Sequence, residues 1–480
     1  MTGTEYDRIA AFLRTDASQQ WRQALDPSLE PELREFLGAG ALGELQALAR
    51  SVTSHLAGPA APNLIFVPGV MGSVLASQGL GGVWWLDIRS RDRIDRLQLA
   101  ANGQNDAEPG ARISPVAVDL SYSGFLAAVE RAEGFSHLAF AYDWRKPLAV
   151  SARRLRETVL AAQAQNSGRP VHLVAHSMGG LVVQTALMLH PELWRHVGKM
   201  VFMGTPHYGA PAVAGYLKNH LWGFHLMALL GRYLSRETFR SLWGVLELLP
   251  APEGVYPGTS DRAGTAHPCA NFDLYDARSW HLGLTPEQEG RLQTVLDYAA
   301  AQHRSRSEWH ENLDQNLCDR MAVIAGVGFK TLFRTAYKRQ FGYLWTHMDR
   351  VTSRVPGDVN REGDGRVPLA SAILERTGET RYAPVKHADL PNVKEVYEDV
   401  FRFLSGTAMQ LPQTPRDEHL AGGSWSNETP LLTGSGPTPD ECLDDPGYLD
   451  LAELPDDVAE ELETRLAAGG LPEFSRLHIL

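Results

Sequence analysis

The sequence predicts an α/β fold: a mostly parallel sheet with helices on both faces and an inserted helical cap. Short apolar runs alternate with stretches in which apolar residues recur at helical spacing. These runs are continuously apolar, which is typical of strands that are buried on both faces. One long interval without such runs predicts the cap. With 480 residues, 44% of them hydrophobic, the chain can form one large core with appendages.

The predicted elements follow one another along the chain. Residues 1–57 are expected to form an N-terminal helical segment, because apolar residues recur there at three- and four-residue spacing. The expected strands are 64–67 (LIFV), 138–142 (LAFAY), 171–175 (VHLVA), 199–204 (KMVFMG), 321–327 (MAVIAGV) and 380–385 (TRYAPV).

The interval between Gly204 and Met321 is too long for a simple connection. We interpret residues 207–318 as the cap, which divides the core into a first part, 58–206, and a second part, 319–405. No internal repeat is evident along the chain.

The final segment, residues 406–480, is predicted to be a flexible acidic tail. It carries 15 acidic and 3 basic side chains, which account for the whole net charge of -12. The remaining body is therefore close to neutral, which argues against nucleic acid as a partner.

The three cysteines, Cys269, Cys318 and Cys442, are scattered and odd in number. This pattern favours neither a disulfide framework nor a metal site, and we expect no cofactor. No run of eighteen apolar residues predicts a membrane-spanning helix. The first residues lack a basic start followed by an apolar run, so we expect no secretory signal and a cytoplasmic location.

The best candidate nucleophile is Ser177. It follows a predicted buried strand and precedes a helical stretch, in the sequence Ala-His-Ser-Met-Gly-Gly. Small residues around such a serine permit the sharp strand-to-helix turn called the nucleophile elbow. The alternative is a serine that merely caps a helix. We expect His176 to be a structural hydrogen-bonding residue, not the base.

The acid and the base are expected after later strands, in the order serine, acid, histidine. Asp364 lies between two glycines on an apparent loop, and His387 directly follows the last predicted strand. A carboxylate there can fix the tautomer of the histidine and stabilise its charged form. Taken singly, these residues could be a turn aspartate and a surface histidine. Rival candidates for the acid are Asp349, Asp358 and Glu362.

Five motifs in this order resemble the lecithin:cholesterol acyltransferase family, which includes lysosomal phospholipases and phospholipid:diacylglycerol acyltransferases. The resemblance spans about residues 60–405. The motifs are Phe66–Ser73 (FVPGVMGS), Ala141–Arg145 (AYDWR), the elbow, Gly204-Thr205-Pro206, and Gly363-Asp364-Gly365 with Val367-Pro368.

The resemblance implies an α/β-hydrolase fold and a serine lipase, phospholipase or O-acyltransferase. It implies that the backbone N–H groups of Val70 and Met178 form the oxyanion hole. We expect Asp143 and Arg145 to brace a loop near the site. The chain departs from the family in having Val70 where a polar residue is frequent. It also lacks the lid cysteines of secreted members, which fits an intracellular, bacterial relative.

Aromatic side chains are the candidates for substrate contacts. The cap is richer in large apolar residues than a surface insertion requires, so it could line an acyl groove, touch a bilayer, or simply pack on the body. Trp84 and Trp85 lie in a Gly-flanked loop that suits a lid or membrane contact. The full candidate set is Trp84, Trp85, Tyr142, Trp144, Trp222 and Trp243.

Three classes of function remain open from the sequence. The first is a lipid acyl hydrolase or acyltransferase whose partner is a lipid-like ester, with peripheral membrane contact through the cap. The second is a soluble esterase for small esters. The third is a non-catalytic binding protein, which the ordered triad disfavours. Hydrolysis and acyl transfer share one acyl-enzyme, so the sequence does not separate them, nor does it give the oligomeric state.

Overall fold

The structure is a computed structural model. It describes residues 8–415, except 10, 13–16, 38–41, 44, 48, 51–61, 86–90, 219–233, 258–272, 330, 341–342 and 351–362. Several residues considered above lie outside the described residues: Trp222, Cys269, Asp358, Glu362 and Cys442.

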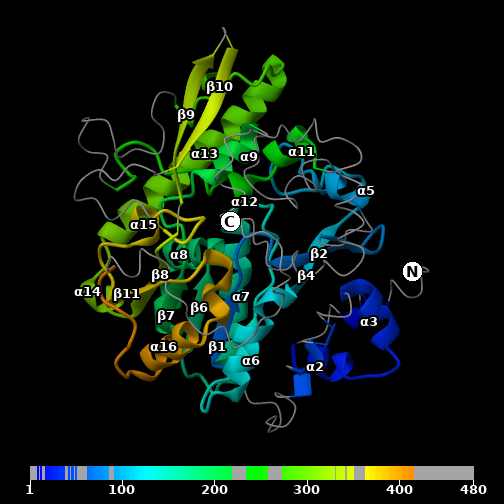
Figure 1. Cartoon of the computed structure of the whole chain (residues 1–480), viewed down its shortest axis with the longest axis vertical. Helices are drawn as coiled ribbons and strands as arrows, with labels where there is room; N and C mark the ends of the chain where they lie inside the picture. The colour runs from blue at the N-terminus through cyan, green and yellow to red at the C-terminus, as the bar shows by residue number, and fades with distance from the viewer. Residues whose placement is uncertain are drawn as a thin grey trace.

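A six-stranded parallel sheet forms the centre of the described chain, in the order β11-β8-β7-β6-β1-β5 (Figure 1). The six predicted runs all form these strands, with ends shifted by a few residues. The bounds are β1 Leu64–Val67, β5 His137–Ala139, β6 Val171–His176, β7 Val197–Met203, β8 Met321–Gly326 and β11 Glu379–Ala383.

Helices cover both faces of this sheet, which explains the continuous apolar runs. Along β1, Ile65 and Val67 join the cluster that includes helices α7 and α8, whereas Leu64 and Phe66 join the cluster of α6 and α16. Alternate side chains of one strand thus enter two different cores. The helices are α6 Ser123–Arg131, α7 Leu148–Gln165, α8 Met178–Leu189 and α16 Lys394–Ser405. The predicted α/β fold is confirmed.

A second, antiparallel sheet of three strands, in the order β3-β2-β4, flanks the first and was not predicted. Strands β2 and β4 contain Ser, β4 also contains Pro, and β3 is only three residues long, so they lack the pattern that marks the central strands. The bounds are β2 Ser73–Ser77, β3 Val83–Trp85 and β4 Ile113–Val118. Between β3 and β4 lie the short helices α5 Arg91–Ile94 and η2 Asp95–Leu97, and η3 Leu120–Tyr122 follows β4.

The cap consists of helices and also includes a hairpin. Its longest helix, α13, begins with a capping box between Thr285 and Gln288. The hairpin β9–β10 contacts α9 and rises beside it, although it belongs to the segment predicted as second core part (Figure 1). The predicted cap boundary, 207–318, is therefore too narrow. The bounds are α9 Ala212–Lys218, α11 Arg236–Arg240, α12 Trp243–Leu246, η5 Ala277–Trp280, α13 Pro286–Glu311, α14 Gln315–Cys318, β9 Leu332–Gln340 and β10 Tyr343–Arg350.

Both ends of the described chain pack on the body. Helices α2 (Ala17–Ala24) and α3 (Glu30–Leu37) contribute to the α6/α16 side of the core. At the other end, buried Asp399 accepts hydrogen bonds from the backbone of Gln410 and Leu411. The predicted start of a flexible tail at 406 is therefore wrong, because residues as far as 412 are held to the core. The remaining short helices are η4 Pro191–Arg195, α15 Leu369–Ala372 and η7 His387–Asn392.

Candidate active site

Ser177 occupies a strained turn between β6 and α8. Its φ of 52° and ψ of -131° lie outside the regions that a serine normally adopts. The turn is tight: a Cβ on Gly179 would lie 2.3 Å from the Val67 carbonyl oxygen, and one on Gly180 would lie 2.1 Å from Thr205 Oγ1. The two glycines are therefore required by close approach, and the turn places the Ser177 hydroxyl at the end of the sheet.

The structure brings Ser177, His387 and Asp364 together. His387 Nε2 lies 3.0 Å from Ser177 Oγ, and His387 Nδ1 lies 2.7 Å from Asp364 Oδ2. A carboxylate can only accept, so Nδ1 carries the proton and Nε2 is left to accept from the Ser177 hydroxyl. All three residues are buried. This arrangement can remove the hydroxyl proton and create a nucleophile.

The loop that carries Asp364 is fixed by its own backbone. The second carboxylate oxygen, Oδ1, accepts from the N–H groups of Arg366 (2.9 Å) and Val367 (2.7 Å). Thr331 Oγ1 accepts from the N–H groups on either side of Asp364, those of Gly363 and Gly365. Because both carboxylate oxygens are occupied, the acid cannot rotate away from the histidine.

Two glycines at the ends of β7 and β8 leave space for the His387–Asp364 pair. A Cβ on Gly204 would lie 3.1 Å from His387 Nδ1 and 3.2 Å from Asp364 Oδ2, and Gly204 has a φ of 55°. A Cβ on Gly326 would lie 2.4 Å from the Asp364 Cβ. The sequence signalled Gly204 only through a family motif, and it gave no signal for Gly326.

The predicted oxyanion donors lie beside the nucleophile. The loop that holds Val70 is in contact with the elbow, since a Cβ on the preceding Gly69 would lie 3.0 Å from Ser177 Cβ. Met178 is the first residue of α8, where backbone N–H groups lack helical acceptors. Within the described part of the chain, no hydrogen-bond acceptor occupies the N–H of Val70 or of Met178. Both groups can therefore donate to a substrate oxygen.

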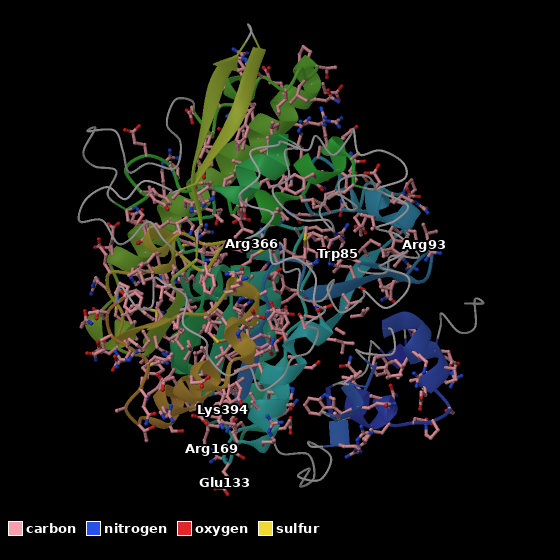
Figure 2. The ribbon with its side chains drawn as sticks, in the orientation of Figure 1. Trp85, Arg93, Glu133, Arg169, Arg366 and Lys394 are labelled. Atoms are coloured by element: carbon pink, nitrogen blue, oxygen red, sulfur yellow. The ribbon has the colours of Figure 1, made fainter. Side chains whose placement is uncertain are left out.

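Trp84 and Trp85 do not form an exposed lid, so that prediction is wrong. Both lie in β3 and are at most 3% exposed. Figure 2 labels Trp85. Trp85 donates from its indole nitrogen to the Met71 carbonyl (3.1 Å), and Trp84 donates to that of Gly81 (3.0 Å). The Gly-flanked loop suggested exposure, but strand pairing with β2 turns both rings inward.

Tyr142 and Trp144, also predicted substrate contacts, support the loop around Val70. The Tyr142 hydroxyl donates to the Pro68 carbonyl (3.0 Å), and Trp144 donates to the Ser73 carbonyl (3.2 Å). Both side chains are buried and their polar atoms are occupied. These contacts indicate a supporting role, because a polar atom bound to the backbone is not available for substrate.

Arg145 clamps this region, as expected for a bracing residue. Its guanidinium is fully buried, pairs with Asp143 and Asp106, and donates to the Leu97 carbonyl at 2.8 Å. Burial alone would raise the pKa of Asp143, but the charge and hydrogen bonds of Arg145, together with the charge of Lys146, outweigh burial and hold that pKa below its usual value. The clamp ties the segment before β4 to the loop after β5.

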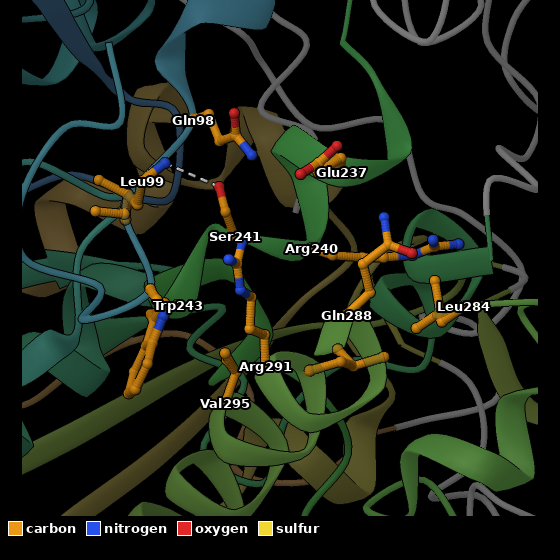
Figure 3. A pocket seen from close by; sticks show the side chains of 13 residues that line it. Gln98, Leu99, Glu237, Arg240, Ser241, Trp243, Leu284, Gln288, Arg291 and Val295 are labelled. Atoms are coloured by element: carbon orange, nitrogen blue, oxygen red, sulfur yellow. Dashed lines mark hydrogen bonds between the residues drawn. The ribbon is translucent and has the colours of Figure 1, made fainter. Parts of the chain in front are cut away.

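Trp243 lines a pocket of about 80 Å³ between the cap and residues 98–101 (Figure 3). Arg291 points toward Ser241 there, and the apolar side chains of Leu99 and Trp243 also line the pocket. None of the three triad residues lines this pocket. The connection with the site is indirect: a Cβ on Gly244 would lie 3.1 Å from Met178 Cε, so α12 packs against the elbow.

Residues 132–261, which contain the elbow, match the family model described as lecithin:cholesterol acyltransferase. This part of the chain is similar to the lecithin:cholesterol acyltransferase family. In this family, the phospholipase A(1) LCAT3 of Arabidopsis thaliana is 33% identical over 127 residues, 26% of this chain and 27% of that protein. Lecithin-cholesterol acyltransferase-like 4 of the same plant is 28% identical over 131 residues, 26% of this chain and 23% of that protein. The matched part thus spans about a quarter of these relatives.

Among solved structures, the Tle4–Tli4 complex has a chain with a TM-score of 0.47 and 14% identity, covering 72% of this chain and 98% of that one. The Bacillus licheniformis lipase BlEst2 has a TM-score of 0.28 and 17% identity, covering 69% and 86% of the two chains. Within the described residues, no helix is long and apolar enough to cross a membrane, and no cluster of three side chains could hold a metal ion.

Proposed function

We propose that this protein is a serine lipase, phospholipase or O-acyltransferase that cleaves a lipid-like carboxylic ester through an acyl-enzyme on Ser177. The observation that carries the proposal is the continuous hydrogen-bonded series from Asp364 through His387 to the Ser177 hydroxyl. Relatives of this family with phospholipase and acyltransferase names support the lipid class of substrate.

In the proposed reaction, His387 Nε2 takes the proton of Ser177 as the serine oxygen attacks the ester carbonyl. The negative charge moves to the carbonyl oxygen, which the N–H groups of Val70 and Met178 stabilise; one such donor is worth about 10²–10³ in rate. His387 then gives its proton to the departing alcohol. Water or a second alcohol, deprotonated by His387, releases the acyl group from Ser177.

The test of the nucleophile is labelling with a fluorophosphonate, followed by mapping of the modified peptide. Wild-type protein should be labelled on Ser177, and Ser177→Ala should lose both labelling and about 10⁴-fold or more of its turnover. Labelling of another serine would refute the assignment.

The rival function is a soluble esterase for small esters, and an acyl-chain series distinguishes it. Turnover should rise from acetyl to long-chain esters if the apolar cap accommodates lipid chains. A preference for acetyl esters would favour the small-ester function instead. Adding a long-chain alcohol and quantifying the transferred acyl product separates acyl transfer from hydrolysis.

A further inference from the structure

A buried hydrogen-bond series links the loop before Val70 to the backbone of His387. The Tyr122 hydroxyl lies 2.8 Å from the Gly69 nitrogen and 2.9 Å from His176 Nδ1. On the other side of the ring, His176 Nε2 lies 2.9 Å from the His387 carbonyl oxygen. Tyr122, His176 and His387 are each at most 1% exposed, so water does not compete for these bonds.

The proton positions in this series follow from the chemistry of its ends. The His387 carbonyl can only accept, so His176 Nε2 carries a proton and, in the neutral ring, Nδ1 is an acceptor. The Gly69 N–H can only donate, so the Tyr122 oxygen accepts there and its own hydroxyl donates to His176 Nδ1. Burial raises the pKa of Tyr122, which keeps the phenol protonated and able to donate.

A second contact joins the same two parts of the chain. Asn392, in the short helix that begins at His387, donates from Nδ2 to the Ser121 carbonyl (2.8 Å) and accepts at Oδ1 from the Phe125 N–H (3.0 Å). The backbone on both sides of Tyr122 is therefore held by the His387 segment. The Tyr122 ring in turn packs on Phe66 of β1, with ring centroids 4.9 Å apart.

We propose that Tyr122, His176 and Asn392 are positioning residues that fix the distance between the oxyanion loop and the base. The inference rests on the proposed function, since it assigns roles to Val70 and His387. Tyr122 orients Gly69, the residue directly before Val70, while His176 and Asn392 hold the segment of His387. None of the three is proposed to touch the substrate.

The test is Tyr122→Phe, which removes the hydroxyl and leaves the Gly69 N–H and His176 Nδ1 without their shared partner. We expect kcat to fall about 10- to 100-fold with KM nearly unchanged, because orientation for the transition state is lost but not binding. Fluorophosphonate labelling of Ser177 should slow by a similar factor and still go to completion.

Tyr275→Phe is the control, because its hydroxyl also hydrogen-bonds to the backbone, here by donating to the Pro250 carbonyl at 2.8 Å. The control should lose similar thermal stability and keep its kcat. Equal kcat values in wild type, Tyr275→Phe and Tyr122→Phe would overturn the positioning role.

If Tyr122→Phe does not fold, Asn392→Asp provides the second variant. It keeps the acceptor for Phe125 but removes the donor to Ser121. We therefore expect kcat to fall at constant KM, by a smaller factor than in Tyr122→Phe. An unchanged kcat in Asn392→Asp would overturn the proposal. Wild-type protein that is never labelled on Ser177 would instead refute the proposed function itself.

Discussion

Two groups of buried histidines in this protein differ in their hydrogen bonding. In the candidate site, both ring nitrogens of His176 and of His387 have partners. Around α13, His207 and His310 are each 5% exposed, yet among the described residues neither ring has a hydrogen-bond partner at either nitrogen. Burial is therefore common to the two groups, and hydrogen bonding at both ring nitrogens is what distinguishes the histidines of the candidate site.

His207 and His310 take no part in the hydrogen bonds of the candidate site. Their burial instead affects how the stability of the fold depends on pH. Burial lowers the pKa of His310 from 6.5 to about 4 and holds the pKa of His207 well below its usual value. Nearby, burial raises the pKa of Glu247 to about 7, although it pairs with the buried Arg306 at 3.4 Å. The hydrogen bonds of the candidate site set the orientation of its histidine rings, whereas the buried titratable groups around α13 make the stability of the fold depend on pH.

The largest expected effect tests the pairing in the site. Asp364→Asn should keep the fold but lose about 10³–10⁴ in kcat, because the amide favours the wrong imidazole tautomer. The measurement is steady-state turnover at matched melting temperatures. Asp358→Asn is the control and should be near neutral; if that variant is inactive while Asp364→Asn remains active, the acid has been misassigned.

The second effect tests how closely the site is packed. Gly204→Ala should reduce kcat about 10- to 100-fold, because its Cβ would enter the space of the His387–Asp364 pair. Gly254→Ala is a matched control, since Gly254 also has a positive φ, 83°, but nothing lies within 4 Å of its Cβ position. Both variants should lose similar stability from backbone strain. Equal activities would show that strain, and not contact with the triad, matters at Gly204.

The third effect tests the pH sensitivity of the α13 region. His310 has a depressed pKa, so its neutral form stabilises the fold above pH 6.5, and this stability is lost as the pH falls toward 4. Each unit of pKa separation corresponds to about 1.4 kcal/mol. His310→Phe should therefore lose less stability than wild type between pH 7 and pH 5 in urea titrations, with unchanged kcat at pH 7. Parallel pH profiles for the two proteins would contradict this.

The smallest effect is expected outside both regions. Truncation after residue 415 should leave kcat within about twofold and the melting temperature nearly unchanged. Truncation after 406 should lower stability, because it leaves the buried Asp399 carboxylate without the N–H groups of Gln410 and Leu411. Calorimetry of the two truncations gives the comparison. Equal melting temperatures would show that residues 407–415 add nothing to the core.

Several features of the structure could not be predicted from the sequence, and the reasons can be identified. The strand that contains Trp84 and Trp85 is three residues long and is preceded by two glycines, a pattern shared with exposed turns. The hairpin β9–β10 lies in a polar stretch without a continuous apolar run, so its attachment to the cap gave no local signal. Tyr122 and His176 are 54 positions apart, and no local spacing relates them.

The sequence by itself determined the six central strands, because a parallel sheet covered on both faces requires continuous apolar runs. It also determined the order of Ser177, Asp364 and His387, because each follows a strand that can be recognised locally. Only the tertiary structure decided which atoms meet. The contacts of Gly204 and Gly326 with Asp364, and the Tyr122–His176 link to His387, join residues that are distant in sequence. Such contacts depend on how the strands are ordered in the sheet, and neither hydrophobic periodicity nor local turn chemistry encodes that order.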